Sequence, residues 1–234
     1  MKIGFVGLGQ MGAPMALNLM KEYDVLIFDK NKNVMHYFAQ RRAEIMSNPE
    51  QAVNIDLLIL CLPTGEDVKD VLFNDHSGLA NHLKKGTIIV DTSTIDYEST
   101  LEVHDKLISM GHYFLDAPVS GMRSRAETGS LTMMVGGDNG ILLRVKSSLS
   151  LMASKILHMG EIGAGQLSKL INNLLFDINI AALAEILPMS TKLGIDPEKI
   201  GEIINSGTGR SYASEFFIPN ILDGDFSNGY PMEN

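Results

Sequence analysis

The sequence has a single cysteine and a shortage of positive charge. Cys61 cannot form an internal disulfide, and it closes the apolar segment DLLILCL, so we interpret it as a buried thiol without a chemical role. The 234 residues carry 19 Lys and Arg against 28 Asp and Glu, which gives a net charge of −9. Because binding of nucleic acid needs clustered Lys and Arg, this balance argues against a nucleic acid partner.

Membrane and metal signals are also missing from the sequence. No uninterrupted apolar run of about 18 residues is present, and no cationic stretch with an apolar core and a cleavage site occurs. We therefore expect a cytoplasmic protein without a membrane partner. The 6 His and 14 Met residues show no metal-ligand spacing, so we expect no metal site.

A glycine-rich turn near the N-terminus is the clearest positive signal. Residues 3–6 predict a buried strand and residues 11–20 a helix, with Gly7, Gly9 and Gly12 in IGFVGLGQMG between them. In a dinucleotide-binding unit the first glycine allows the tight turn, the second lets the backbone approach phosphate, and the third lets helix and strand pack closely. This order predicts a nucleotide cofactor.

An acidic residue follows at the spacing that a dinucleotide site requires. Asp29 ends the predicted strand in DVLIFDK, about 20 residues after the glycines, where a carboxylate accepts the ribose hydroxyls. Its charge would repel the 2′-phosphate of NADP, which favours NAD, although Lys30 and Lys32 could partly offset that repulsion.

Strand-like and helix-like segments alternate through the first two thirds of the chain, which predicts an α/β fold with a doubly wound parallel sheet. After Asp29, the strand candidates are DLLILCLP, GTIIVDTS, HYFLDAPV, GSLTMMVGG and KILHMG, with a helix near 139–152. We expect a Rossmann-type domain over residues 1–162 and an all-α domain, built on one long helix, over residues 163–234.

The long helix is predicted from residue 164 to about 193, with Pro188 kinking it or splitting it after Leu187. Apolar residues lie around most of its circumference, so it must be covered on both sides. Two short helices, near 197–205 and 212–222, would cover one side. We expect a partner subunit on the other, in a homodimer or a tetramer.

Three further segments place polar groups where chemistry is expected. DTST, residues 91–94, follows a parallel strand, where open α/β sheets bind ligands. DAPVSG presents Ser120 and the neighbouring N–H groups, which suit a carboxylate. In GQLSKLINNLL, Lys169, Asn172 and Asn173 project from one helix face. Each segment also fits a purely structural role, as a turn or a solvated polar stripe.

Taken together, the glycine turn, CLP, DTST, DAPVSG with GSLTMMVGG, and GAGQLSKLINN resemble the β-hydroxyacid dehydrogenase family. The resemblance implies that Lys169 is the catalytic lysine and that Asn173 orients both lysine and substrate. Ser120 and Gly121 would hold the substrate carboxylate, with Asn172 assisting. The remaining positions that it implies contact the cofactor: Gly7, Leu8, Gly9, Gln10, Met11, Gly12, Leu62, Pro63 and Thr94.

The chain departs from the family pattern in two places. Met122 and Arg125 stand where many relatives have glycine, with Arg123 between them, and either arginine could bind a second anionic group of the substrate. The alternative is two solvated arginines on a loop. Related chains also continue past FSNGYPM into further helices, so we expect the helical domain to be incomplete at Asn234.

The sequence therefore predicts an NAD-preferring oxidoreductase that acts on a small β-hydroxy acid. Lys169 would accept the hydroxyl proton during oxidation and return it during reduction. Burial or neighbouring charge would depress its pKa, since a lysine with an ordinary pKa is a poor base at neutral pH. The alternatives are an NADPH-dependent reductase of a short semialdehyde acid and a non-catalytic nucleotide-binding protein of the same fold.

Overall fold

A computed structural model describes residues 1–41 and 43–225 of the chain. It divides into two compact units, Met1–Lys169 and Leu170–Asn234. The division falls within one long helix, α7, whose first turns belong to the first unit. The domain boundary that the sequence predicts, between residues 162 and 163, lies just before this helix begins.

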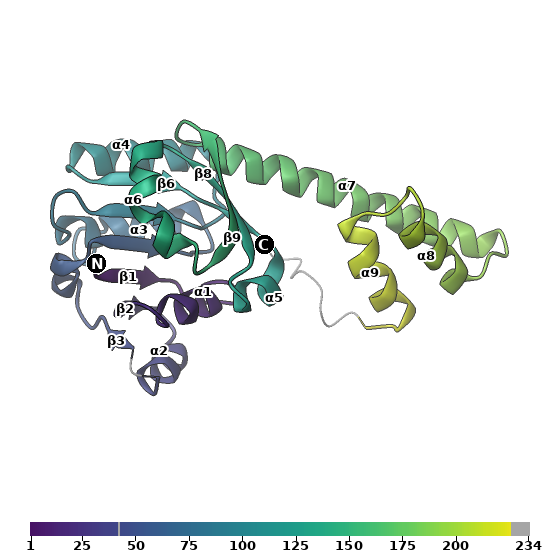
Figure 1. The fold of residues 1–234 in the computed structure, drawn as a ribbon, viewed down its shortest axis with the longest axis horizontal. Helices are drawn as coiled ribbons and strands as arrows, with labels where there is room; N and C mark the ends of the chain where they lie inside the picture. The colour runs from purple at the N-terminus through teal and green to yellow at the C-terminus, as the bar shows by residue number, and fades with distance from the viewer. Residues whose placement is uncertain (42, 226–234) are drawn as a thin grey trace. The chain divides into compact units, whose positions relative to one another are not determined.

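The first unit is built on a nine-stranded sheet in the order β3-β2-β1-β4-β5-β6-β8-β7, with β9 paired to β8 (Figure 1). Its first six strands are β1 Ile3–Val6, β2 Val25–Phe28, β3 Glu44–Ile45, β4 Leu57–Leu60, β5 Ile88–Asp91 and β6 Tyr113–Asp116. They pair in parallel. The sheet reverses its direction of growth beside β1, which places the end of β1 at the switch point where such sheets bind ligands.

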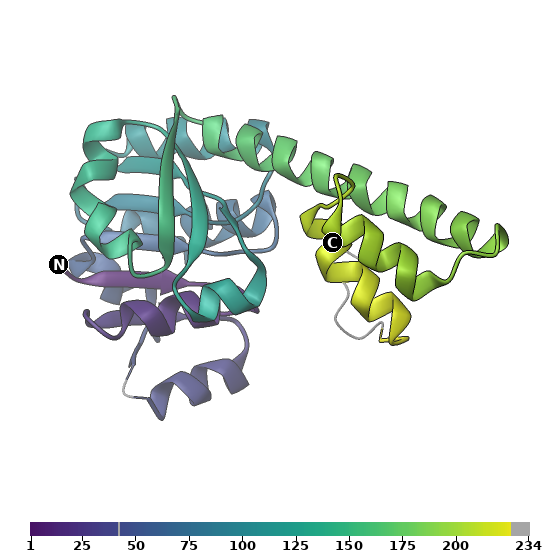
Figure 2. The same ribbon diagram turned by 45° about the vertical axis from the view of Figure 1, so that its right-hand side comes forward.

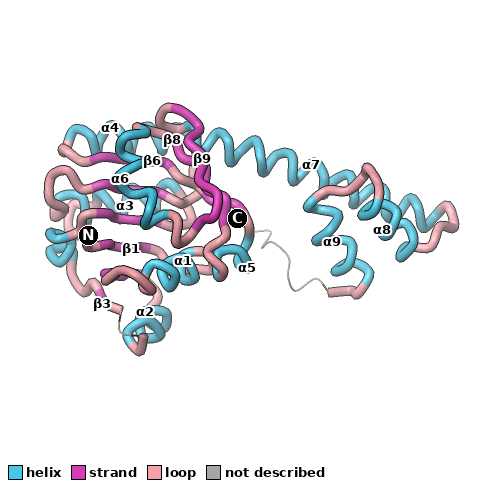
Figure 3. Tube along the Cα trace, viewed as in Figure 1, coloured by secondary structure: helices cyan, strands magenta, loops and turns pink. Residues whose placement is uncertain are grey.

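Helices cover both faces of the sheet, as the helix and strand colours of Figure 3 show. The main helices of this unit are α1 Gly12–Leu19, α2 Lys32–Ala39, α3 Gly65–Phe73, α4 Tyr97–Ser109, α5 Met122–Glu127 and α6 Asn139–Leu149, with short 3-10 helices at Pro49–Asn54 and Leu79–Asn81. Alternate strand residues enter opposite cores. Leu57 and Ile59 pack with α1 and α6, whereas Leu58 and Leu60 pack with α3 and α4.

The far edge of the sheet is not parallel. The last strands are β7 Val119–Ser120, β8 Leu131–Gly136 and β9 Ala153–Gly160. β8 runs antiparallel to both β6 and β7, and β9 is parallel to β8. The sheet is therefore mixed, because β7 continues the direction of β6 in the same antiparallel register against β8, and the chain reverses through α5 before β8 begins. The apolar pattern of β8 predicts a strand but carries no information on its direction.

The second unit contains the greater part of α7, Ala164–Lys192, with α8 Pro197–Ser206 and α9 Tyr212–Leu222. In Figure 2, α8 and α9 lie against the later turns of α7. Their core consists of Leu183, Ala213 and Ile218 with partly buried neighbours. Of the two predicted effects of Pro188, a kink or a split after Leu187, the split is wrong, because α7 continues through Pro188 to Lys192. Leu183 and Leu187, which precede Pro188, pack into this core.

α7 also corrects the expectation that no segment could cross a membrane. An 18-residue segment within Ala164–Lys192 has a mean hydropathy of 1.5, and 6 % of this segment is buried. By length and composition, this helix could therefore span a bilayer. Asn172, Asn173 and Asp177 interrupt the apolar residues of this helix, so its sequence contains no uninterrupted apolar run of that length. Core helices of soluble proteins can have the same length and composition.

Candidate active site

The glycine turn between β1 and α1 is tightly packed on one side and open on the other. Gly7 has a φ of +93°, and a Cβ on it would collide with the carbonyl oxygen of Cys61. A Cβ on Gly12 would collide with the carbonyl oxygen of Gly7, so only glycine lets α1 approach this closely. A Cβ on Gly9 would meet nothing within 4 Å. The turn therefore leaves free space beside Gly9.

The N-terminus of α1 adjoins this space and has the features of an anion site. Its N-cap residue, Met11, makes no side-chain hydrogen bond to the helix, and the first turn contains no acidic residue. The unpaired N–H groups and the dipole at such a helix end favour a phosphate. Leu8 is buried and Gln10 is exposed. This turn fits the pyrophosphate of a dinucleotide cofactor.

Asp29 follows β2 and lies beside the glycine turn. Its carboxylate accepts hydrogen bonds from the backbone N–H of Leu8 at 2.6 Å and of Asn31 at 2.7 Å. These bonds hold the half-buried carboxylate at the carboxyl edge of the sheet. A carboxylate oxygen can accept more than one hydrogen bond, so Asp29 keeps the capacity to bind a ribose hydroxyl.

The segments after β4 and β5 are hydrogen-bonded to each other. The backbone N–H of Leu62 donates to Ser93 Oγ at 2.8 Å, and the N–H of Ser93 donates to Asp91 at 2.9 Å. Beside them, burial raises the pKa of the Cys61 thiol to about 12, so the thiol stays protonated. Pro63 and Thr94 are exposed at the same edge. The predicted cofactor positions therefore gather along the ends of neighbouring strands.

Ser120 and Gly121 lie where β7 passes into α5. Gly121 has a φ of +138°, and a Cβ on it would lie 2.9 Å from Cδ of Arg125. The next residue, Met122, has a φ of +59°, a left-handed conformation that is unfavourable for a residue with a side chain. The backbone is strained at the position where the family pattern has glycine. Such strain is concentrated at functional sites.

The two arginines of this loop have different surroundings. Arg123 Nε donates to Glu127 at 2.8 Å, one turn along α5. Arg125 makes no ion pair with any residue that the structure describes, and its stem lies against Gly121. Arg125 is therefore the better placed of the two to bind an anion beside Gly121.

Lys169 lies on α7 and is only 8 % exposed. Burial lowers the pKa of its ammonium group from the ordinary lysine value, because desolvation disfavours the charged form. Within residues 1–41 and 43–225 it has no hydrogen-bond or ion-pair partner. A buried lysine without a structural partner is suited to proton transfer.

Asn172 and Asn173 follow Lys169 on α7. The structure shows Asn172 Nδ2 donating to Asn173 Oδ1 at 3.4 Å, with Asn172 exposed and Asn173 half-buried. Residues four apart on a helix lie on one face, so Asn173 is one turn beyond Lys169. Both asparagines belong to the second unit.

Two buried residues that the sequence analysis did not assign organise the start of α7. The carboxylate of Asp116 accepts the backbone N–H of Gly163 at 2.8 Å and of Gln166 at 2.9 Å. Gln166 is 3 % exposed, and its side chain bonds to the segment around Thr94. Both residues occur in the quoted motifs, but no spacing rule connects them across about fifty residues of sequence.

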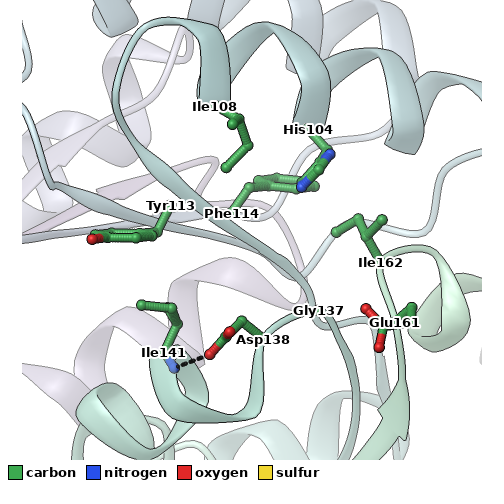
Figure 4. A pocket seen from close by; sticks show the side chains of 9 residues that line it. All are labelled: His104, Ile108, Tyr113, Phe114, Gly137, Asp138, Ile141, Glu161 and Ile162. Atoms are coloured by element: carbon green, nitrogen blue, oxygen red, sulfur yellow. Dashed lines mark hydrogen bonds between the residues drawn. The ribbon is translucent and has the colours of Figure 1, made fainter.

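A separate cavity of about 190 Å³ lies in the first unit (Figure 4). It contains none of the predicted site residues. Asp138 caps α6 by accepting the N–H of Ile141 at 2.9 Å, and His104 pairs with Asp105. Its lining residues are His104, Ile108, Tyr113, Phe114, Gly137, Asp138, Ile141, Glu161 and Ile162.

Comparison with known protein families agrees with this geometry. Residues 2–160 match the NAD binding domain of 6-phosphogluconate dehydrogenase. Residues 163–233 match the NAD-binding region of NADP-dependent 3-hydroxyisobutyrate dehydrogenase. The chain belongs to the β-hydroxyacid dehydrogenase family. The predicted nicotinamide cofactor and the predicted fold class, a Rossmann-type domain followed by a helical one, are confirmed.

Several relatives in the β-hydroxyacid dehydrogenase family cover nearly the whole chain. 2-(Hydroxymethyl)glutarate dehydrogenase of Eubacterium barkeri is 40 % identical over 99 % of this chain and 78 % of its own length. Human mitochondrial 3-hydroxyisobutyrate dehydrogenase is 35 % identical over 95 % of this chain and 67 % of its own length. The structure of Mycobacterium tuberculosis 3-hydroxyisobutyrate dehydrogenase with L-serine, at 35 % identity, superposes with a TM-score of 0.86 over 93 % of this chain and 74 % of that one.

Proposed function

We propose that this dehydrogenase oxidises a small β-hydroxy acid with NAD and that Lys169 is its general acid and base. The observation that carries the proposal is the burial of Lys169, with a lowered pKa and no partner among the described residues, on a helix that starts from the nucleotide-binding sheet. A bound nicotinamide supplies the hydride acceptor. Relatives named for hydroxy acid substrates support the reaction class.

The side chains proposed to act with the cofactor have separate roles in proton transfer and substrate binding. In the oxidation, neutral Lys169 Nζ takes the proton of the substrate hydroxyl, and in the reduction the ammonium returns it. Ser120 Oγ and the N–H of Gly121 bind the substrate carboxylate, and Asn173 orients the lysine and the substrate. Asn172 adds a polar group at the same face of α7.

Asp29 supports NAD as the preferred cofactor. Its carboxylate is held beside the glycine turn by Leu8 and Asn31, so it would face the ribose of a dinucleotide bound there. An NADP 2′-phosphate at that position would meet a fixed negative charge. The ammonium of Lys30 lies 3.6 Å from Asp67 and is highly exposed to solvent. Solvent screening therefore lets Lys30 offset little of the repulsion between Asp29 and the 2′-phosphate.

A partner subunit is part of the same proposal. Five apolar residues on the middle turns of α7 are each more than half exposed, which a stable helix in water does not tolerate over so large a patch. Burial of this patch against a second copy would form a homodimer, the smallest closed assembly. The five residues are Leu170, Ile171, Leu174, Leu175 and Ile178.

The deciding experiment measures absorbance of the reduced nicotinamide with NAD and with NADP across a panel of β-hydroxy acids, for the parent protein and for Lys169→Ala. We expect turnover with NAD that falls about 10²- to 10⁴-fold in the variant. Turnover only in the reduction of semialdehyde acids with NADPH would favour the reductase alternative. Nucleotide binding without turnover on any substrate would identify a binding protein of the same fold.

A further inference from the structure

The side chain of Gln166 bonds to the backbone on both sides of Thr94. Gln166 Nε2 donates to the carbonyl oxygen of Ser93 at 2.8 Å, and Gln166 Oε1 accepts the N–H of Ile95 at 3.3 Å. The carboxamide therefore satisfies one acceptor and one donor that flank a single exposed residue. A side-chain amide offers both a donor and an acceptor, so one carboxamide makes both bonds.

Gln166 is itself held in place from a third strand. Its backbone N–H donates to Asp116 at 2.9 Å at the end of β6. A Cβ on its neighbour Gly165 would lie 2.5 Å from the carbonyl oxygen of Met134 and 2.7 Å from Asp116 Oδ2. The first turn of α7 is thus pressed against the sheet and fixed by hydrogen bonds there.

The same bridge extends to the segment after β4. Ser93, which accepts Gln166 through its carbonyl oxygen, also accepts the N–H of Leu62 through Oγ at 2.8 Å. A continuous series of hydrogen bonds therefore runs from Leu62 through Ser93 to Gln166. Lys169 follows Gln166 by one helical turn.

We infer that Gln166 is a positioning residue that fixes Leu62 and Thr94, on the cofactor side of the site, relative to Lys169. The inference rests on the proposed function of Lys169 as general acid and base. Proton transfer and hydride transfer occur at neighbouring substrate atoms, so the lysine and the cofactor must keep a fixed separation. A displacement of about 1 Å can lower the rate on the order of 10²-fold.

Two substitutions change the hydrogen bonds of the Gln166 carboxamide in different ways. Gln166→Glu keeps the acceptor for Ile95 and, once ionised, places a carboxylate oxygen against the Ser93 carbonyl, so this variant is assayed at a pH where the introduced carboxyl is ionised. Gln166→Met keeps the length of the side chain and removes both bonds. Thr87→Val is the matched control, because Thr87 is fully buried and bonds to Ile55 and Lys84 at the opposite end of β5.

The test combines steady-state kinetics, titration with NADH followed by nucleotide fluorescence, and amide hydrogen exchange without nucleotide. We expect both Gln166 variants to lower kcat about 10- to 100-fold, to weaken NADH binding and to raise the isotope effect of a deuterated substrate. The Ile95 amide should exchange faster in Gln166→Met. Thr87→Val should lower the Tm while leaving kcat, NADH affinity and exchange at Ile95 unchanged.

The inference is overturned if both Gln166 variants keep the parent kcat and NADH affinity while only their Tm falls, as in the control. If Gln166→Met does not fold, the isosteric Gln166→Glu carries the test. Full turnover by Lys169→Ala would instead refute the proposed role of Lys169 as general acid and base. Exchange at Ile95 and NADH affinity report on the bridge in either case.

Discussion

Asp91 and Asp116 pair in register at the carboxyl ends of β5 and β6, and both side chains are fully buried. Asp116 accepts two backbone N–H groups from the start of α7, whereas Asp91 Oδ2 has no hydrogen-bond partner among the described residues. Burial raises the pKa of Asp91 to about 6, and the charge of Asp116 adds to the rise. Burial also raises the pKa of Asp116.

Asp91→Asn should therefore stabilise the first unit at alkaline pH. The folded-state pKa of Asp91 lies above its unfolded value, so the free energy of unfolding falls as the pH rises from about 4, where the unfolded carboxyl ionises, to about 6, and stays at the lower level above that. The free energy of unfolding should rise by about 2 to 3 kcal/mol near pH 8, with the gain vanishing toward about pH 4. Urea unfolding at both pH values measures this. An equal gain in the free energy of unfolding at the two pH values would contradict this prediction.

The rate of oxidation should rise with pH and level off below the ordinary lysine pKa of about 10.4. Neutral Lys169 is the base, and burial lowers its pKa, so the neutral form accumulates earlier than in an exposed lysine. The reverse reaction should lose rate over the same interval. Lys169→Arg, which stays protonated, should abolish the rise. A flat profile for kcat/KM in both directions would count against the assignment.

Asp29→Asn should shift cofactor choice toward NADP. The substitution removes the negative charge while keeping an oxygen that can accept the N–H of Leu8 or Asn31. The ratio of kcat/KM with NADP to that with NAD should rise about tenfold, which corresponds to roughly 1.4 kcal/mol of relieved repulsion. Asp138→Asn, at the N-cap of α6, is the control and should leave the ratio unchanged.

Arg125 and Arg123 should differ in their effect on substrate choice. Arg125→Gln should lower kcat/KM for a dicarboxylate β-hydroxy acid about 10- to 100-fold, as expected for loss of a charged hydrogen bond, and affect a monocarboxylate little. Arg123→Gln should have little effect on either, because Arg123 pairs with Glu127. Equal losses on both substrates would assign Arg125 a structural role only.

Local patterns predicted much of the fold. The glycine turn and the start of α7 follow from glycine spacing and helical periodicity, and the structure places both where the sequence does. The direction of β8 could not be predicted, because strand pairing depends on how the two-residue strand β7 and the six-residue helix α5 redirect the chain. Elements this short leave no periodic signal.

Sequence motifs predicted the site residues, but they did not predict the contacts between one motif and another. Asp29 beside Leu8 fits the spacing expected for a nucleotide-binding unit. The bonds from Gln166 to Ser93 and Ile95 span more than seventy residues of sequence and depend on the packing of α7 against the sheet. Pro188 is a further case, since proline locally disfavours a helix interior, yet α7 continues through it.

The state of Cys61 makes this chain convenient for site-specific labelling. With a thiol pKa of about 12, Cys61 carries almost no thiolate at neutral pH and should react slowly with maleimides. A second cysteine introduced at the exposed Ser206, at the end of α8, would then be the fast-reacting thiol. A dye could be attached to the helical unit without first removing the native cysteine.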